Sequence, residues 1–545
     1  MIYLEKKIKT YGLIIGIVLF IALLAGLSYA YYELYTENKN AVSGTVGCFS
    51  VDYAKGNNIN GDLILFDESK IINNNNITIK EGMQLTYVNA KIKEECTIDG
   101  YLNINLNVRA LKEGFISGNS IGALKYVIAK YSPNTYTNPT ISTLKDQTFE
   151  ITKSGSITSK GELTILSENL SHTTTNGYLI IFYIDGNLAS NDIASNTESN
   201  FSATISAVAN QGKFTAAKYI TSLYTNATKT KAQNNGIEYN YASSVSLMND
   251  RLGGTTSDLD GGNIRYYGAS PNNYIYFNCS DYNNQSDTTC EKWRIIGVFG
   301  NQVKIIRNET IGAYSWDTSA SGVNSGDGEN EWPQADLMKL LNPGYDSETS
   351  GGSLYYNSKS GKCYTSSSST TSCDFTSSGI KNEETRNKIA KVTWNLGGWN
   401  SSSIYSNQIY GYERGTKVYS GRSKTWPGRI ALPYPSDYGY ATDFNKCTQD
   451  LYNYESSTNS YGCKNNDWMY PIITNSSSND GWLLTPNSGY ASIAWSVDSS
   501  GYVNSYGAGR DVSRAGGVAP VLYLSSEQVI ESGGDGSISN PYKLG

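Results

Sequence analysis

The sequence predicts a mostly β protein with an α+β C-terminal domain, placed behind an N-terminal membrane helix. Short runs of apolar residues recur between Gly and Asn turns, which is typical of strands. Only 17% of the residues are charged, and polarity comes from Asn, Ser, Thr, Gly and 44 tyrosines. That composition favours short strands joined by turns over long helices.

The first element is an uncharged run from Tyr11 to Tyr32, preceded by Lys6, Lys7 and Lys9. A bilayer core needs about 20 apolar residues, and basic residues upstream stay in the cytoplasm. We therefore expect residues 1–35 to be a signal-anchor or a signal peptide. Ser28-Tyr29-Ala30 has the small residues of a cleavage site, so both fates stay open. Either one exports the rest of the chain, to the outer face of the membrane or as a secreted protein.

The next segment, 41–211, is predicted to be an antiparallel β-sandwich. A chain of 545 residues is too long for one core, and all nine tryptophans lie at or after Trp293, which marks a change of domain. Six segments alternate or cluster apolar residues between turn residues. They are 61–67, 82–93, 100–111, 123–131, 161–170 and 176–187.

Residues 212–250 are predicted to bridge two domains and to contain one short helix. Phe214, Ala217, Ile220 and Leu223 recur near helical spacing. We expect this apolar face to pack against a domain. A partner-binding face is the alternative.

Residues 251–545 are predicted to form an α+β domain. The text WRIIGVFGNQVKIIR, 293–307, reads as a hairpin around Gly300 and Asn301. A helix in ADLMKLLN would place Leu337, Leu340 and Leu341 on a sheet. VAPVLYL, 518–524, reads as a buried strand near the C-terminus.

Eight cysteines agree with export into an oxidising compartment. No CxxC occurs, and the spacings do not suit zinc. We expect consecutive pairing, because it closes short local loops. The expected pairs are Cys48–Cys96, Cys279–Cys290, Cys363–Cys373 and Cys447–Cys463.

Charge and histidine content exclude several functions. A net charge of −6 without a basic stripe argues against nucleic-acid binding. The single histidine, His172, lies in a polar stretch, so a Ser-His-Asp triad and a multi-His zinc site are not expected. The 49 acidic residues still leave room for a pair of hydrolytic carboxylates, although no pair stands out.

No cofactor is expected, and calcium is the only candidate cation. Asp258, Asp260 and Asn263 in SDLDGGN have part of the spacing of a calcium loop, but the terminal Glu is missing. An ordinary Asp/Gly turn explains the same residues. Glu329 and Glu331, with Asp327, form a second acidic segment that a solvated loop explains equally well.

Aromatic residues crowd Gly-, Ser- and Asn-rich segments of the second half. Loops of this composition make adaptable recognition surfaces, and sugar rings stack on exposed aromatic rings. For any single ring, packing in the core is the alternative. The predicted ligand-binding residues are Trp399, Tyr412, Trp426, Tyr438, Tyr490, Trp495, Tyr502 and Tyr506.

From Tyr241 to Leu544 the chain resembles a family of Gram-positive surface proteins. The markers are WRII at 293–296, WLL at 482–484, GVAPVLYL and the NPYKL ending. The resemblance implies a C-type-lectin-like fold, shared distantly with formylglycine-generating enzymes. Those enzymes use reactive cysteines near the end of the fold, and no cysteine follows Cys463. The Glu-Pro-Asn-like and Trp-Asn-Asp-like motifs of calcium-dependent lectins are not evident either.

The sequence therefore predicts a non-enzymatic cell-surface adhesin or recognition protein. Its partners would be the cell membrane, through the N-terminal helix, and a glycan or surface protein bound by the C-terminal domain. The alternatives are an envelope enzyme acting on polysaccharide and a structural matrix or pilus-like component.

Overall fold

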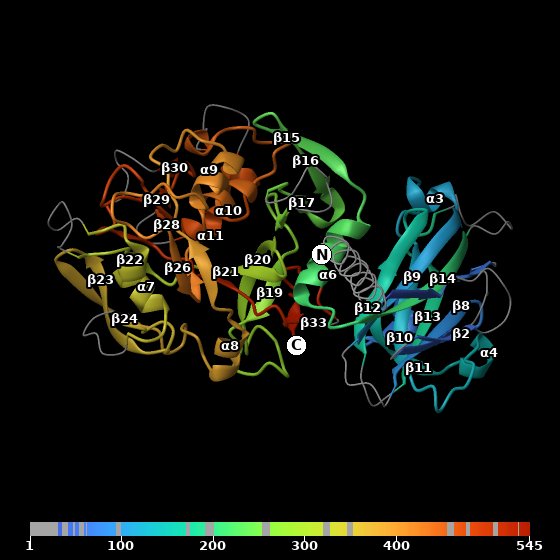
Figure 1. The fold of residues 1–545 in the computed structure, drawn as a ribbon. Helices are drawn as coiled ribbons and strands as arrows, with labels where there is room; N and C mark the ends of the chain where they lie inside the picture. Colours follow the sequence, from blue (N-terminus) through green and yellow to red (C-terminus); the bar gives the residue numbers. More distant parts are fainter. Residues whose placement is uncertain are drawn as a thin grey trace, which may run out of the picture. The chain divides into compact units, whose positions relative to one another are not determined.

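The computed structural model shows a mostly β protein with several antiparallel sheets and few helices (Figure 1). It divides into two compact units, Met1–Phe214 and Thr215–Gly545. The residues that it describes are 31–34, 42–46, 49–53, 59–60, 63–93, 100–170, 175–190, 201–252, 262–319, 328–345, 352–454, 463–475, 480–504, 511–531 and 533–545.

The first unit contains two sheets, drawn in blue to green in Figure 1. The larger has the order β2 (Val42–Val46), β3 (Phe49–Tyr53), β8 (Gln84–Ile92), β13 (Asn176–Asp185), β10 (Leu124–Tyr131), β11 (Thr148–Ser156), β7 (Asn76–Thr78) and β6 (Ile72–Asn73), with β5 (Leu65–Phe66) parallel to β13. The smaller has the order β1 (Tyr31–Leu34), β14 (Phe201–Gln211), β9 (Gly100–Leu111) and β12 (Gly161–Leu170), with β4 (Ile59–Asn60) beside β14. The short helices are α2 (Glu68–Ile71), α3 (Glu113–Ile116) and α4 (Ile141–Leu144).

Strand periodicity explains how these sheets are buried. Alternate residues of β9, from Leu102 to Val108, are buried, and the asparagines between them face outward. β13 is apolar on both faces: Ile180 belongs to the core shared with β9, whereas Ile181 belongs to a second core that includes residues flanking α4. The continuous apolar sequence of β13 is therefore explained by its position as a central strand that is buried on both faces.

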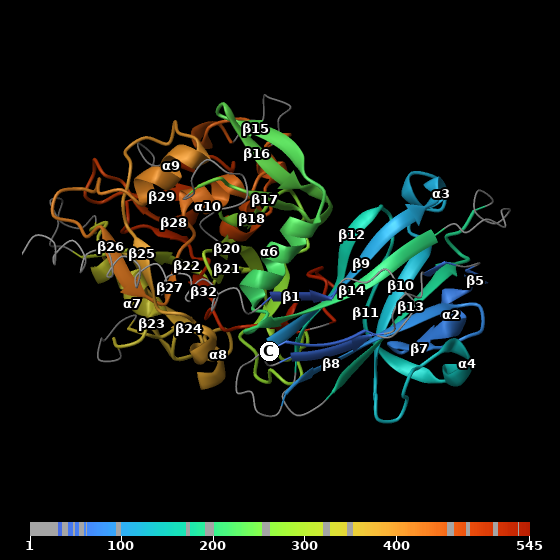
Figure 2. The same ribbon diagram turned by 45° about the vertical axis from the view of Figure 1, so that its right-hand side comes forward.

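The second unit is built on a sheet of nine strands, best followed in Figure 2. Their order is β15 (Thr230–Asn234), β16 (Ile237–Ala242), β17 (Leu247–Asn249), β18 (Ile264–Tyr266), β20 (Glu291–Phe299), β21 (Gln302–Arg307), β32 (Val521–Tyr523) and β27 (Ile430–Ala431), with β19 (Tyr274–Phe277) beside β20. Helix α6 (Ala216–Asn226) packs Ile220 into the same core. The segment 212–250, predicted as a bridge, thus contributes α6 and β15–β17 to this unit.

Smaller sheets and short helices complete the second unit. A five-stranded sheet has the order β22 (Ala313–Ser315), β31 (Ala515–Gly517), β28 (Gly481–Pro486), β29 (Ala494–Val497) and β30 (Val503–Asn504). Pairs of strands are β23 (Ser360–Ser366) with β24 (Ser369–Asp374), β25 (Val392–Asn395) with β26 (Thr425–Gly428), and β33 (Ile530–Glu531) with β34 (Lys543–Leu544). The helices are α7 (Asp336–Leu341), α8 (Glu383–Lys388), α9 (Ser406–Glu413), α10 (Pro435–Tyr440) and α11 (Tyr470–Ile473).

Several local predictions are confirmed. The hairpin forms as β20 and β21, with Gly300 at a φ of 62° in the turn, a conformation that glycine adopts without strain. Helix α7 buries Leu337, Leu340 and Leu341. In the first unit the predicted segments form β8, β9, β10, β12 and β13, and only 61–67 is shorter than expected, reduced to β5.

Three predicted disulfides are present: Cys279–Cys290, Cys363–Cys373 and Cys447–Cys463. They close short loops separated by 11, 10 and 16 residues. The predicted pair Cys48–Cys96 lies outside the described residues, as does the apolar run up to Ala30. Among the helices that the structure describes, none has the length and apolarity needed to cross a membrane.

Candidate functional site

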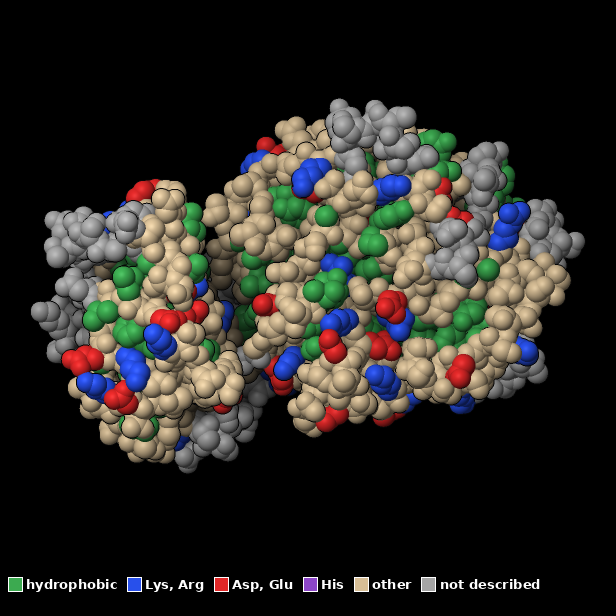
Figure 3. Space-filling view, turned by 180° about the vertical axis from the view of Figure 1, so that it is seen from behind, with side chains coloured by type: hydrophobic (Ala, Val, Ile, Leu, Met, Phe, Trp, Pro, Cys, Tyr) green, Lys and Arg blue, Asp and Glu red, His purple; other side chains and the backbone are tan. Residues whose placement is uncertain are grey.

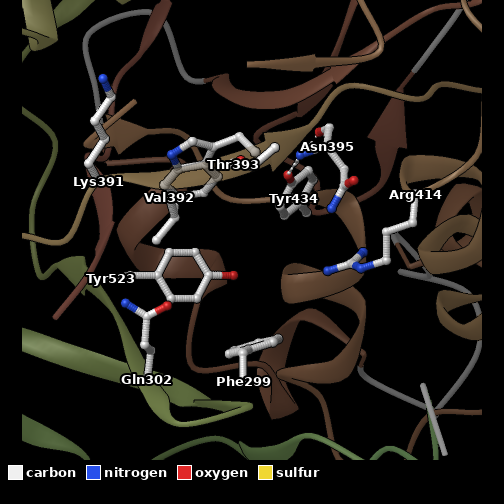
Figure 4. Close-up of a pocket in the computed structure, with 10 residues that line it drawn as sticks. Phe299, Gln302, Lys391, Val392, Thr393, Asn395, Arg414, Tyr434 and Tyr523 are labelled. Carbon is white, nitrogen blue, oxygen red and sulfur yellow. Dashed lines mark hydrogen bonds between the residues drawn. The ribbon is translucent and has the colours of Figure 1, made fainter. Parts of the chain in front are cut away.

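The candidate site is a cleft of about 420 Å³ in the second unit, which we call the aromatic cleft (Figure 4). Strand β25 forms one wall, and the turn of the β20–β21 hairpin, the end of β32 and the caps of α9 and α10 form the rest. It is lined by Phe299, Gln302, Lys391, Val392, Thr393, Trp394, Asn395, Arg414, Tyr434 and Tyr523. Three segments that are far apart in the sequence, FGNQ, KVTWN and VLYL, contribute residues to this cleft.

The four aromatic rings of the cleft also surround the buried ammonium group of Lys304. The Lys304 Nζ lies 4.5 Å from the ring centroid of Tyr434 and 5.3 Å from that of Phe299. It lies 5.5 Å from the centroids of both Trp394 and Tyr523. A cation beneath aromatic faces is attracted by their negative quadrupoles, and it fixes the rings in place.

A chain of buried ion pairs lies behind these rings. Lys304 donates to Asp437, and Asp437 also accepts from Nη1 of Arg265 at 3.0 Å. Nε of Arg265 donates to Asp250 at 2.6 Å. All four side chains are at most 1% exposed. Two cations face two anions, so the chain is neutral, which is the condition under which such burial is tolerated.

Burial and pairing compete in setting the pKa values of this chain. Burial lowers the pKa of Lys304 to about 8, although the neighbouring Asp437 opposes the shift. Burial would raise the pKa of Asp437, but Lys304 and Arg265 outweigh it and hold that pKa below its usual value. Both groups are therefore charged at neutral pH.

Arg414 joins the cleft to a second buried acid. Its Nη1 donates to Glu413 Oε2 at 2.9 Å, and its guanidinium lies 3.4 Å from the ring centroid of Tyr410. Glu413 is fully buried and also accepts from the backbone N and the hydroxyl of Ser436. Burial raises the pKa of Glu413, and Arg414 and Ser436 oppose that shift.

Polar groups converge on the open space of the cleft. Figure 4 shows the hydroxyl of Tyr523 and the guanidinium of Arg414 pointing toward each other across the cavity, with the side-chain amide of Asn395 beside them. The backbone of Asn395 is held on both sides by the Tyr434 hydroxyl, which accepts from its N at 2.9 Å and donates to its O at 2.8 Å. Burial raises the pKa of Tyr523, so its hydroxyl stays protonated and can donate. The half-buried rings of Phe299 and Tyr523 lie beside these donors and acceptors, and such a combination is how pockets hold small polar ligands.

The predicted ligand-binding aromatics fall into several environments. Trp426, Tyr438 and Trp495 are core residues with exposures of 7%, 0% and 0%, so they present no ring face to solvent. They sit in the hydrophobic core because strands and a buried helix, not loops, carry them. Tyr506 lies outside the described residues.

The other four predicted aromatics reach the surface. Trp399 and Tyr412 are half-buried and stack on each other, with ring centroids 3.9 Å apart. The ammonium of Lys417 covers Trp399 at 3.8 Å. Tyr502 is half-buried, and Tyr490 is 43% exposed. None of the seven that the structure describes lines the aromatic cleft.

The structure describes only some of the candidate cation ligands. Asp258, Asp260 and Asp327 lie outside the described residues. Asn263 donates to Asp250 and to the Tyr410 hydroxyl, which is a structural role. Glu329 pairs with Arg422 at 2.7 Å.

Glu331 accepts from the backbone N of Ser423 at 2.9 Å. Within the described ranges no cluster of three or more His, Cys, Asp or Glu side chains could hold an ion.

The surface character agrees with the composition. The face in Figure 3 is mostly uncharged polar surface, over which Lys and Arg are interspersed with Asp and Glu. A second hollow, in the first unit, is lined by Lys91, Lys130 and Tyr131 among others, but Lys130 is neutralised by Glu168 at 2.5 Å. The aromatic cleft is the better-formed site, because its rings and polar groups are held by a buried network.

The fold and the cleft together define a disulfide-containing, mostly β protein with a candidate small-ligand site in its second unit. No protein-family model matches the chain, and no curated protein matches it either.

Proposed function

We propose that the chain is an exported cell-surface recognition protein whose C-terminal, C-type-lectin-like unit binds a glycan in the aromatic cleft. The observation that carries the proposal is the convergence of Arg414, Asn395 and Tyr523 on a cavity floored by aromatic rings. Sugars present both C–H faces, which stack on aromatic rings, and hydroxyl groups, which need donors and acceptors. A volume of about 420 Å³ accommodates one or two sugar residues.

Export is supported by the cysteines and by the composition. Three disulfides are present, and such bonds persist in oxidising compartments. The run Tyr11–Tyr32 behind three lysines would anchor or export the chain. In this proposal the first unit acts as a spacer that holds the recognition unit away from the membrane.

The test is binding of the full chain, purified in mild detergent, to an array of glycans and glycoproteins. The decisive variant is Thr393→Trp, which fills the cleft from an exposed position on β25. Thr370→Trp, on the exposed strand β24, is the matched control. We expect saturable binding that is lost in Thr393→Trp and kept in Thr370→Trp.

Three results would contradict the proposal. Binding that survives Thr393→Trp would place the ligand elsewhere, and capture of proteins irrespective of their glycans would indicate a protein partner. Release of sugar from the array would show an envelope enzyme instead.

A further inference from the structure

The residues that line the aromatic cleft include positively charged side chains and no negatively charged ones. Among its ten lining residues two are cations, Lys391 and Arg414, and none is an acid. This bias contrasts with the chain as a whole, whose net charge is −6. The nearby acids are fully buried: Glu413 pairs with Arg414, and Asp437 pairs with the buried Lys304.

Two ion pairs, Lys304–Asp437 and Arg414–Glu413, lie at the cleft, and each forms an electric dipole. Lys304 lies directly beneath the four rings, and its partner Asp437 lies on α10 behind it. Arg414 likewise points into the cavity while Glu413 points away, toward Ser436. In the Arg414–Glu413 pair the positive end therefore faces the ligand space, and the low-dielectric walls weaken screening. The cavity therefore favours an anion.

Arg414 has hydrogen-bonding capacity left for such an anion. Its hydrogen bonds to the described residues all use Nη1, to Glu413 at 2.9 Å and to the Tyr410 carbonyl at 3.4 Å. Nε and Nη2 keep the planar pair of donors that matches a carboxylate in a bidentate contact. The side chain is 23% exposed, so a ligand can reach it.

The neighbouring groups suit a sugar ring that carries this anion. The Tyr523 hydroxyl faces Arg414 across the cavity, and the Asn395 amide adds a donor and an acceptor. The ammonium of Lys391 points away from the cavity in Figure 4, which leaves Arg414 as the one cation aimed into it. A carboxylate carries one negative charge, which suits a single guanidinium that is already paired with Glu413. A dianionic phosphate would need a second cation in the cavity.

We propose that the glycan residue bound in the aromatic cleft is a carboxylated sugar, a uronic or sialic acid, whose carboxylate is held by Arg414. This inference rests on the proposed function, since it names the class of glycan that the cleft takes. The Asn395 amide and the Tyr523 hydroxyl orient the ring, and the aromatic floor contacts its apolar face.

The test compares pairs of ligands that differ only in the acid. Glycans ending in glucuronic acid or N-acetylneuraminic acid are printed beside their carboxyl-reduced forms, together with a sugar phosphate. The full chain should bind the carboxylated forms at least tenfold more tightly than the reduced forms, and the preference should weaken as salt is raised.

The variant Asn395→Asp makes the test specific. It adds one negative charge inside the cleft at a side chain that makes no hydrogen bond to the described residues, so the fold should survive. Asn445→Asp, at an exposed position outside the cleft, adds the same charge as a control. We expect at least a tenfold loss of affinity for carboxylated glycans with Asn395→Asp and none with Asn445→Asp.

The outcomes separate this inference from the proposed function. Equal binding of acidic and reduced forms, unaffected by Asn395→Asp, overturns the inference but keeps a glycan-binding cleft. Tighter binding of the sugar phosphate also overturns it. Absence of binding to every printed glycan overturns both proposals.

Discussion

Lys304 and Asp437 form an ion pair in which neither side chain has any solvent exposure. The pair connects β21 to α10, and it lies directly beneath the aromatic cleft. Because Asp437 also accepts from Arg265 and from the backbone N of Tyr434, it holds three elements together. The cleft floor and the core of the second unit thus depend on the same carboxylate.

Lys304→Met should destabilise the second unit by about 3 kcal/mol, because it leaves a buried carboxylate with one cation fewer. Asp437→Asn should cost about as much, since it leaves both Lys304 and Arg265 short of a partner. Urea unfolding of the two single variants and the double variant measures the coupling. We expect the double variant to lose much less than the sum of the singles. Strict additivity would show that the pair does not act as a unit.

Asp467 should make stability fall as pH rises from about 4. Burial raises its pKa well above the usual value, and its Oδ2 has no hydrogen-bond partner among the residues that the structure describes. Between the unfolded and folded pKa values the folded state holds the extra proton, so raising pH favours unfolding, and above the folded pKa the penalty is constant.

The variant Asp467→Asn should remove this slope. Its stability relative to the wild type should improve between pH 4 and neutral pH by about 1.4 kcal/mol per unit of pKa shift. Chemical denaturation at a series of pH values measures the difference, and a difference independent of pH would contradict the assignment.

Trp495→Ala should lose about 3–5 kcal/mol of stability, because the ring is fully buried and its removal leaves a cavity. Tyr490→Ala, at a ring that is 43% exposed, should stay within about 0.5 kcal/mol of the wild type. Thermal or urea unfolding separates the two. Equal effects would mean that these neighbours differ less in packing than the structure shows.

Replacing both Cys363 and Cys373 by alanine should cost roughly 3 kcal/mol of stability, because the unfolded chain gains conformational freedom. The bond links β23 to β24 across a separation of 10 residues. Ligand binding should be unchanged, since neither strand lines the aromatic cleft. Unfolding in the absence of reductant tests the stability, and a loss of binding would implicate the hairpin in the site.

Local periodicity carried most of the fold prediction. Residues close in sequence determine the alternating burial of β9, the continuous apolar run of β13 and the turn at Gly300. The two strands and the turn form as expected. The topology of the second unit was not accessible, because β32 pairs with β21 across more than half of that unit's chain. Short segments such as β25 can be assigned as strands only once such pairings are known.

The site was harder to predict because its residues are far apart in sequence. The abundance of aromatic residues predicted Trp426 and Trp495 as ligand-binding residues, but abundance alone does not distinguish buried rings from exposed ones. Arg414 belongs to no motif, and only the fold brings it to the same cleft as Tyr523. The sequence identified the 293–307 hairpin and the VAPVLYL strand as separate elements, and only the fold brings them together with residues 391–395.

The most direct measurement of the central claim is hydrogen–deuterium exchange of the full chain with and without a glycan that binds on the array. The account predicts slower exchange at residues 391–395, at the 299–302 turn and around Arg414, and little change elsewhere. Protection confined to the surface around Trp399 and Tyr490, with none at β25, would contradict the assignment of the aromatic cleft as the binding site.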